Sequence, residues 1–416
     1  MPTGTIVATR GGLITARMPA LCIGAGARVM TRSGRVVPAR VTAVDRRRVT
    51  LAPFAGLDGI AVGDRIEADP AVLEICVGVA ILGRAIDALG RSVDGLHEPR
   101  GKRGGTHGGC RPAERVAIDA PFITGVRAID GPLAFGVGAR IGIFGAPGCG
   151  KSTLLETIVA GSSADVTVVG LVGERGREAE RWIANIDART TIVCATSDRS
   201  AAERLRAAEI AFAQADALRK RGLHVLLVID SLARVAAAAR DVAVAAGEPV
   251  GRGGYPPSVF GVLAGLLERA GRFTTGSITL VASVLSDGAD ERDPVSDACR
   301  AALDGHIVLA ERLARQGWFP AIDLAASASR TLADVASPRH FASARALRQA
   351  VAVLDETREA RQFGLDPGAG DAAIRRAIDE QVSIAGFLRQ REPADPAATL
   401  AELGALTDRL SDGYSR

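Results

Sequence analysis

Apolar runs typical of buried strands alternate with helical patterns between residues 123 and 330. Such alternation predicts a mostly parallel sheet with helices on both faces. One helix is marked by its ends, because Ser200 and Glu203 form a capping box and Gly222 follows its last turn. The strands of this sheet are expected at residues 140–144, 166–172, 191–194, 225–229 and 278–285.

The N-terminal part has a different pattern. Between residues 5 and 69, short β-branched runs are separated by Gly, Asp and Arg, which predicts a small β-barrel. Residues 98–111 are Gly-rich and basic and have no apolar period, so we expect an exposed loop there.

The C-terminal part is helical in pattern after Pro338. We expect further helices at residues 374–391 and 400–410, which together would form a small helical domain. The predicted fold class is therefore α/β, with an α/β core between a small N-terminal β-barrel and a C-terminal α-helical domain. The expected domains are residues 1–70, 71–335 and 336–416.

Composition agrees with a globular protein. At 416 residues, 47% hydrophobic and 24% charged, the chain can bury a large core. Its longest uncharged apolar stretches, such as residues 273–286, are shorter than the about 18 to 20 residues of a membrane helix. Residues 1–10 lack the apolar core of a signal peptide, so we expect a cytoplasmic protein.

Charge and cysteine placement argue against two other kinds of site. With 51 Lys plus Arg against 47 Asp plus Glu, the net charge of +4 gives no strong electrostatic case for nucleic acid, and we expect none as a partner. The six cysteines lie far apart, without the close spacing of zinc or redox motifs.

One motif, the glycine-rich stretch at residues 145–153, carries specific chemistry. Its glycines allow successive backbone N–H groups to surround phosphate oxygens, at the positive end of the helix expected from about Thr153. Lys151 would reach the β and γ phosphates, and the Ser152 hydroxyl would bind Mg²⁺. The alternative is a Gly-rich turn with a chance lysine, but only three lysines occur in the chain. The expected cofactor-binding residues are Gly145, Ala146, Pro147, Gly148, Cys149, Gly150, Lys151, Ser152 and Thr153.

Acidic residues follow two of the expected strands. Asp230 ends the strand at 225–229, at the sheet edge where nucleotides bind, and is expected to hold Mg²⁺ together with Ser152. Glu174 follows the strand at 166–172 and is expected to be the catalytic base that polarises water. Arg175 is grouped with it as a candidate catalytic residue. The alternatives are a plain strand end at Asp230 and a surface ion pair of Glu174 with Arg175.

These motifs together resemble the ATPases of type III secretion and flagellar export, which are related to rotary ATP synthase catalytic subunits. The resemblance covers nearly the whole chain and implies a RecA-like P-loop core for its α/β part. An aromatic residue common in that family is replaced by Asp366, so the sequence names no residue that packs against adenine. The matching stretches are residues 121–130, 145–153, 173–178, 225–230, 254–260, 303–309, 320–323 and 329–330.

The resemblance implies a mechanism and partners. Glu174 would activate water, Lys151 and Asp230 would act on phosphate and metal, and Arg330 would reach the nucleotide of the neighbouring subunit in a homohexamer. The implied ligands are ATP and Mg²⁺. The implied partners are a central stalk protein, a peripheral stator protein, and complexes of chaperones with export substrates. The protein would lie at the cytoplasmic face of the inner membrane, releasing chaperones and unfolding substrates.

Four alternative functions remain. A flagellar export ATPase and a rotary ATP synthase catalytic subunit would share the chemistry, although the tail lacks the acidic run typical of the synthase. A hexameric RNA helicase would stack bases on aromatics of the barrel, but Phe54 is the only aromatic between residues 1 and 121. A non-catalytic nucleotide-binding subunit would typically carry Gln at position 174.

Overall fold

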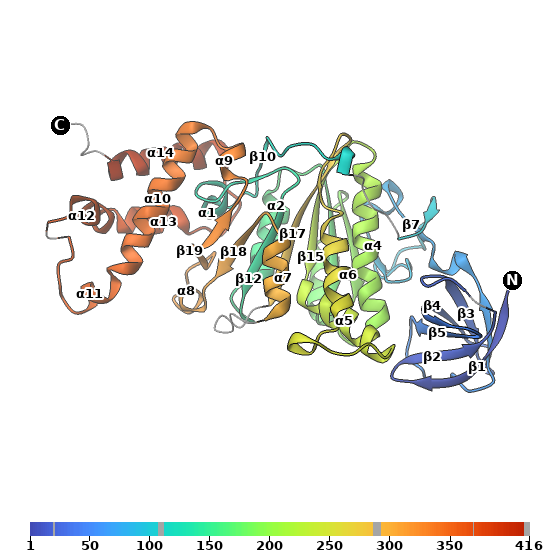
Figure 1. Cartoon of the computed structure of the whole chain (residues 1–416). Coiled ribbons are helices and arrows are strands. Elements are labelled where there is room, and N and C mark those ends of the chain that lie inside the picture. Colours follow the sequence, from blue (N-terminus) through green and yellow to red (C-terminus); the bar gives the residue numbers. More distant parts are fainter. Residues whose placement is uncertain (20, 107–111, 286–292, 369, 412–416) are drawn as a thin grey trace. The chain divides into compact units, whose positions relative to one another are not determined.

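The computed structural model describes residues 1–19, 21–106, 112–285, 293–368 and 370–411, and Figure 1 labels its elements. The chain forms two compact units, each built from segments far apart in the sequence. The first contains Met1–Pro112, Val166–Arg269 and Asp293–Ala298, and the second contains Ala113–Asp165, Ala270–Arg292 and Cys299–Arg416.

The first unit begins with a closed six-stranded barrel of order β1-β2-β5-β4-β3-β6, drawn in blue in Figure 1. Alternate residues point inward, as Val37, Ala39 and Val41 do on one strand, because successive side chains of a strand face opposite sides. The predicted barrel is confirmed. Its strands are β1 (Thr3–Arg10), β2 (Leu13–Arg17), β3 (Gly26–Met30), β4 (Val36–Asp45), β5 (Arg48–Pro53) and β6 (Arg65–Ala68).

The first unit also contains parallel strands in the order β15-β13-β14-β8. Every residue of β13 is buried, as expected of a parallel strand with both faces covered. The capping box of Ser200 and Glu203 starts α4 as predicted. The elements are β8 (Arg84–Asp87), β13 (Val166–Val172), β14 (Thr190–Ala195), β15 (His224–Asp230), α3 (Gly176–Ala184), α4 (Ala201–Arg219), α5 (Leu232–Ala245) and α6 (Pro257–Leu267).

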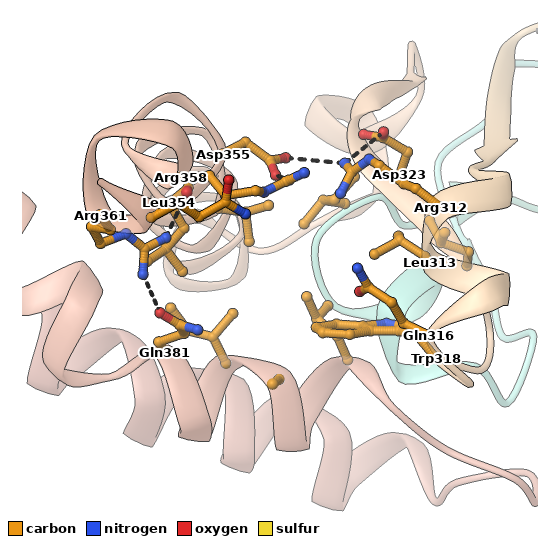
Figure 2. Close-up of a pocket in the computed structure, with 17 residues that line it drawn as sticks. Arg312, Leu313, Gln316, Trp318, Asp323, Leu354, Asp355, Arg358, Arg361 and Gln381 are labelled. Carbon is orange, nitrogen blue, oxygen red and sulfur yellow. Dashed lines mark hydrogen bonds and ion pairs between the residues drawn. The ribbon is translucent and has the colours of Figure 1, made fainter. Parts of the chain in front are cut away.

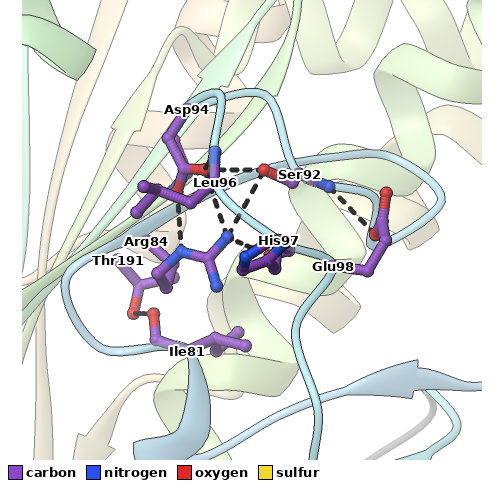
Figure 3. A network of polar contacts seen from close by, with 9 residues as sticks. Ile81, Arg84, Ser92, Asp94, Leu96, His97, Glu98 and Thr191 are labelled. Carbon is purple, nitrogen blue, oxygen red and sulfur yellow. Dashed lines mark hydrogen bonds and ion pairs between the residues drawn. The ribbon is translucent and has the colours of Figure 1, made fainter.

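The segment after β8 is held by one polar network, shown in Figure 3. Arg84 pairs with Asp94 at 2.8 Å and donates to the carbonyl oxygen of His97 at 2.6 Å. Although burial alone would raise the pKa of Asp94, hydrogen bonds from Arg84, Ser92 and backbone amides hold it well below its usual range. The loop is therefore fixed to the edge strand of the sheet.

The loop expected at residues 98–111 is only partly a loop. β9 (Arg103–Gly104) pairs antiparallel with β7 (Ile75–Cys76), so backbone pairing orders part of this Gly-rich stretch. A strand of two residues leaves no apolar period for sequence reasoning to detect. The remainder of that expectation, at residues 107–111, lies outside the described residues.

The second unit contains strands in the order β19-β18-β12-β17. β12 runs parallel to β17 and β18, whereas β19 is antiparallel to β18 and forms the edge. The strands are β12 (Arg140–Gly145), β16 (Gly271–Arg272), β17 (Ser277–Leu285), β18 (Gly305–Leu309) and β19 (Ile322–Ser329). All five predicted core strands are thus confirmed to within one residue at their ends.

The C-terminal helices, orange to red in Figure 1, pack with the second unit. The prediction of a single helix at residues 374–391 is wrong. The chain is broken at Glu380 into two helices, because the ψ of 5° at this residue departs from helical geometry. Among the described residues, no helix combines the length and apolar character needed to cross a membrane. The helices are α10 (Pro338–Glu356), α11 (Arg358–Gln362), α12 (Ala372–Asp379), α13 (Gln381–Leu388) and α14 (Pro396–Ser411).

Short elements complete the fold, and the predicted combination of barrel, α/β core and C-terminal helices is confirmed. These elements are η1 (Pro70–Leu73), η2 (Val79–Ile81), η3 (Pro112–Glu114), η4 (Arg252–Gly254), β10 (Pro121–Phe122), β11 (Phe135–Gly136), α1 (Arg127–Asp130), α2 (Lys151–Gly161), α7 (Pro294–Ala302), α8 (Glu311–Arg315) and α9 (Leu332–Val335).

Candidate nucleotide site

The predicted phosphate loop joins the end of β12 to the start of α2 in the second unit. Gly148 and Gly150 have φ angles of +84° and +89°, values that L side chains rarely adopt. Gly150 caps a helix that starts at Lys151, two residues earlier than the sequence indicated. The first amides of α2 therefore lie next to the turn, in the arrangement that binds anions at a helix N-terminus.

Lys151 lies at the centre of this loop. Its Nζ donates to the carbonyl oxygens of Gly145 and Ala146, each at 2.8 Å, and the residue is only 9% exposed. The amine is thus held over the turn whose backbone would surround a phosphate. Ser152 follows on the first turn of α2, where its hydroxyl is half-buried.

The acidic residues come together in the first unit. β13 pairs with β15 so that Leu171 lies opposite Asp230, and Glu174 follows three residues after Leu171. Glu174 and Asp230 are 9% and 6% exposed. Burial first, and then the charge of Asp230, raise the pKa of Glu174 to about 7. A carboxyl with this pKa is suited to take a proton at neutral pH.

Arg234 on α5 is a site residue that the sequence analysis missed. Its Nε donates to the Glu174 carboxylate at 3.2 Å, and both its charge and its hydrogen bond lower the pKa of Glu174. Gly173 has a φ of +73°, and a Cβ there would lie 2.8 Å from the Arg234 side chain. The one available signal was the position of Arg234, four residues after Asp230 on the next helix.

The two other predicted arginines are exposed. Arg175 is the residue before α3. In the described part of the chain, Glu174 pairs with Arg234 and not, as in the alternative interpretation, with Arg175. Arg330 directly follows the edge strand β19 in the second unit. Its backbone N–H donates to the backbone carbonyl oxygen of Asp304 at 2.9 Å, and its exposed guanidinium donates to the carbonyl oxygen of Arg300 at 3.4 Å.

A cavity of about 340 Å³ adjoins the phosphate loop within the second unit. Phe319 lines this cavity and is 44% exposed, and the bond that joins it to Pro320 is cis. A Cβ on Gly150 would lie 3.7 Å from the Phe319 ring, so ring and loop are neighbours. The other lining residues are Val126, Gly150, Thr153, Leu154, Thr157, Leu309, Pro320, Ala321, Gln390 and Arg391.

Gln390 fixes the walls of this cavity. Its backbone N–H donates to the Phe319 carbonyl at 2.9 Å, and its side chain donates to Gly125 at 2.7 Å and accepts from Arg127 at 2.6 Å. The sequence analysis noted only that Asp366 replaces a common aromatic residue, and it did not name Phe319. The signal was present, since Phe319 immediately precedes the matching stretch 320–323.

These residues fit Mg²⁺ and a nucleotide chemically. Mg²⁺ prefers one or two carboxylates together with substrate phosphates, and Ser152 and Asp230 offer oxygen ligands of that kind. In the described part of the chain, no group of three or more His, Cys, Asp or Glu side chains could hold a metal alone. A glycine turn, a buried lysine and a helix N-terminus after a parallel strand define a P-loop nucleotide-binding protein.

The comparisons with known proteins specify the family. Residues 125–329 match the model of the ATP synthase alpha/beta family, nucleotide-binding domain. The type 3 secretion system ATPase of Pseudomonas syringae pv. tomato is 38% identical over 99% of this chain and 95% of its own length. The flagellum-specific ATP synthase of Treponema pallidum is 40% identical over 93% of this chain and 88% of its own length.

The fold agrees with these relatives. The assembled ATPase EscN of the enteropathogenic E. coli type III secretion system has a TM-score of 0.92 and 39% identity, covering 97% of this chain and all of that chain. EscN in complex with its central stalk EscO has a TM-score of 0.89. The chain therefore belongs to the family of type III secretion and flagellar export ATPases.

Proposed function

We propose that the protein hydrolyses Mg-ATP to drive type III protein secretion, releasing chaperones from export substrates and unfolding them. The observation that carries this proposal is the similarity to secretion ATPases along 99% of the chain. The buried Glu174 supports turnover as well as binding, because its raised pKa suits a general base.

In the proposed reaction, the backbone of residues 145–153 and Lys151 bind the polyphosphate. The water oxygen attacks the γ phosphorus, the bond to the β–γ bridging oxygen breaks, and Glu174 accepts the proton of the water. Mg²⁺, held by Ser152 and Asp230, would neutralise phosphate charge. Phe319 would pack against the adenine base beside the phosphate loop.

Arg330 is proposed to act on the nucleotide of a neighbouring subunit in a homohexamer. Its exposed position after an edge strand supports an outward role, and a guanidinium there would stabilise the charge of the transition state. The similarity to assembled EscN and to its complex with EscO supports a ring with a central stalk protein. We further propose a peripheral stator protein and chaperone–substrate complexes as partners, at the cytoplasmic face of the inner membrane.

Glu174→Gln tests the catalytic assignment. The variant should bind ATP with nearly unchanged affinity, while turnover falls about 10²- to 10⁴-fold because the proton acceptor is lost. Glu180→Gln, on the exposed face of α3, is the matched control and should hydrolyse ATP normally. Normal hydrolysis by Glu174→Gln would remove Glu174 from the mechanism.

Flagellar export is the second candidate function, because a flagellum-specific relative is as similar as the secretion ATPases, at 40% identity. Both functions need the same site chemistry, so only the partners separate them. Expression in a strain lacking its flagellar export ATPase distinguishes them. Restored motility would favour flagellar export, whereas no motility from a well-expressed, ATP-hydrolysing protein would favour the secretion assignment.

A further inference from the structure

A second cavity, of about 420 Å³, lies between the C-terminal helices and the edge of the sheet in the second unit. Figure 2 shows its side chains arranged around one common space, with contributions from α8, β19, α10, α11 and α13. Its volume lies within the range of small-molecule sites. The apolar lining residues are Leu313, Trp318, Ile322, Leu324, Val351, Leu354, Ile384, Ala385 and Leu388.

Three arginines also line this cavity, together with only two carboxylates. Arg312 pairs with Asp323 at 3.1 Å and with Asp355 at 3.5 Å. Arg358 pairs with the same Asp355, so one carboxylate serves two guanidinium groups. Burial first, and then the charge of Arg312, lower the pKa of Arg358, as expected where positive charge is in excess.

Arg361 is the third arginine, and it has no carboxylate partner among the described residues. It donates to the side-chain oxygen of Gln381 and, at 2.9 Å, to the carbonyl oxygen of Leu354. Its Nε is buried and makes no hydrogen bond within the described part of the chain. A guanidinium without a counter-ion next to an apolar surface favours an anion that also has an apolar part.

This cavity also shares a wall with the cavity beside the phosphate loop. Trp318 lines the first and Phe319 lines the second, so consecutive side chains face the two spaces. At the end of α13, Leu388 lines the first cavity, and Gln390, two residues later, lines the second. Arg389 between them stacks on Trp318, with 4.2 Å from the guanidinium carbon to the ring centroid. A group that moves Trp318 would therefore also move Phe319.

We propose that the arginine-lined cavity binds a small organic anion with an aromatic or apolar body, and that this binding is linked to nucleotide binding through Trp318 and Phe319. The anionic group lies at Arg361, and the body lies on Trp318, Leu354 and Ile384. The binding site stands independently of the proposed ATPase function. The linkage rests on that function, because it requires the nucleotide base next to Phe319.

Two fluorescent probes with the same apolar body test the site. The anion 8-anilinonaphthalene-1-sulfonate should bind the wild-type chain at one saturable site, and Arg361→Gln should weaken it about tenfold or more. The neutral N-phenyl-1-naphthylamine has no sulfonate, so Arg361→Gln should leave its affinity nearly unchanged. Arg345→Gln, an exposed position of α10 outside the cavity, is the matched control and should bind both probes normally.

A cavity-filling variant separates specific binding from a change in folding. Ala385→Phe should exclude both probes, while circular dichroism and ATP hydrolysis show that the chain remains folded. Equal binding of the anion to wild type, Arg361→Gln and Ala385→Phe would overturn the site. Complete displacement of the anion by a non-hydrolysable ATP analogue would also overturn it, because the probe would then occupy the nucleotide site.

The linkage has a separate readout. A saturating non-hydrolysable ATP analogue should change the affinity for the anionic probe several-fold, and Phe319→Ala should remove most of this change. The anion should shift the affinity for the nucleotide by the same factor, because coupling between two sites is reciprocal. An unchanged probe affinity, measured while the analogue is bound, would overturn the linkage and leave the anion site standing.

Discussion

The phosphate loop and the acidic pair place charge in opposite ways. In the loop, one buried amine is held by two carbonyl oxygens from residues five and six positions earlier. In the acidic pair, Glu174 follows one strand and Asp230 ends its neighbour, both are buried, and Arg234 donates to Glu174. The first arrangement depends on local backbone geometry, whereas the second depends on which strands are neighbours.

The difference affects how each group responds to its surroundings. The carbonyl oxygens stabilise the positive charge of Lys151 within a single turn. Glu174 is destabilised as an anion by burial and by Asp230, and Arg234 offsets this only in part. Substitutions in the loop should therefore change binding of phosphate, whereas substitutions around Glu174 should change proton transfer.

The largest expected effect lies outside both regions. Arg330→Ala should lower turnover by about 10³- to 10⁵-fold if the guanidinium stabilises the transition state. In a homohexamer, adding the catalytically dead Glu174→Gln chain should restore part of the activity, because each variant supplies what the other lacks. Steady-state hydrolysis of mixtures measures this. The exposed Arg315→Ala is the control, and full activity of Arg330→Ala alone would contradict a catalytic role.

Lys151→Ala probes the loop directly. Loss of the amine should weaken ATP binding about 10- to 100-fold and lower turnover about 10²- to 10³-fold. Calorimetry and steady-state kinetics give the two quantities. Lys220→Ala, which removes a lysine paired with Asp216 at the end of α4, should change neither. Normal ATP binding by Lys151→Ala would show that Lys151 acts only in turnover, as Glu174 does.

Phe319→Ala should weaken nucleotide binding about tenfold, since stacking of a base on an aromatic ring contributes roughly 1 to 3 kcal/mol. The effect should appear in KM more than in kcat, because the ring lies beside the base and not at the γ phosphate. Phe363→Ala is the matched control, since this 83%-exposed ring does not line the cavity. If Phe363→Ala gave the larger effect, the base would lie elsewhere.

Arg234→Ala should give the smallest change, in the pH profile. Glu174 must be deprotonated to accept a proton, so wild-type kcat should rise with pH through about 7. Arg234 lowers this pKa, and its removal should move the midpoint upward and reduce activity at pH 7 roughly three- to tenfold, with recovery at alkaline pH. Arg240→Ala, on the same helix and paired with Asp241, should leave the profile unchanged. A profile that does not move would separate Arg234 from Glu174.

Elements with a local cause could be predicted from the amino-acid sequence alone. The capping box of α4, the full bounds of β13 and the glycines of the phosphate loop were predicted, because backbone preference and apolar periodicity act within a few residues. The family resemblance followed from the same short stretches. The break at Glu380 was not predicted, because both helices flanking it have apolar patterns compatible with one helix.

Which distant side chains meet depends on how the whole chain folds. The pairing of β13 with β15 places Glu174 near Asp230 and raises its pKa, and no local pattern contains that strand order. The packing of the C-terminal helices places Gln390 on Phe319 and leaves Arg361 without a carboxylate partner among the described residues. Such contacts join residues tens to hundreds of positions apart, so burial and charge at the site become known only once the chain is folded.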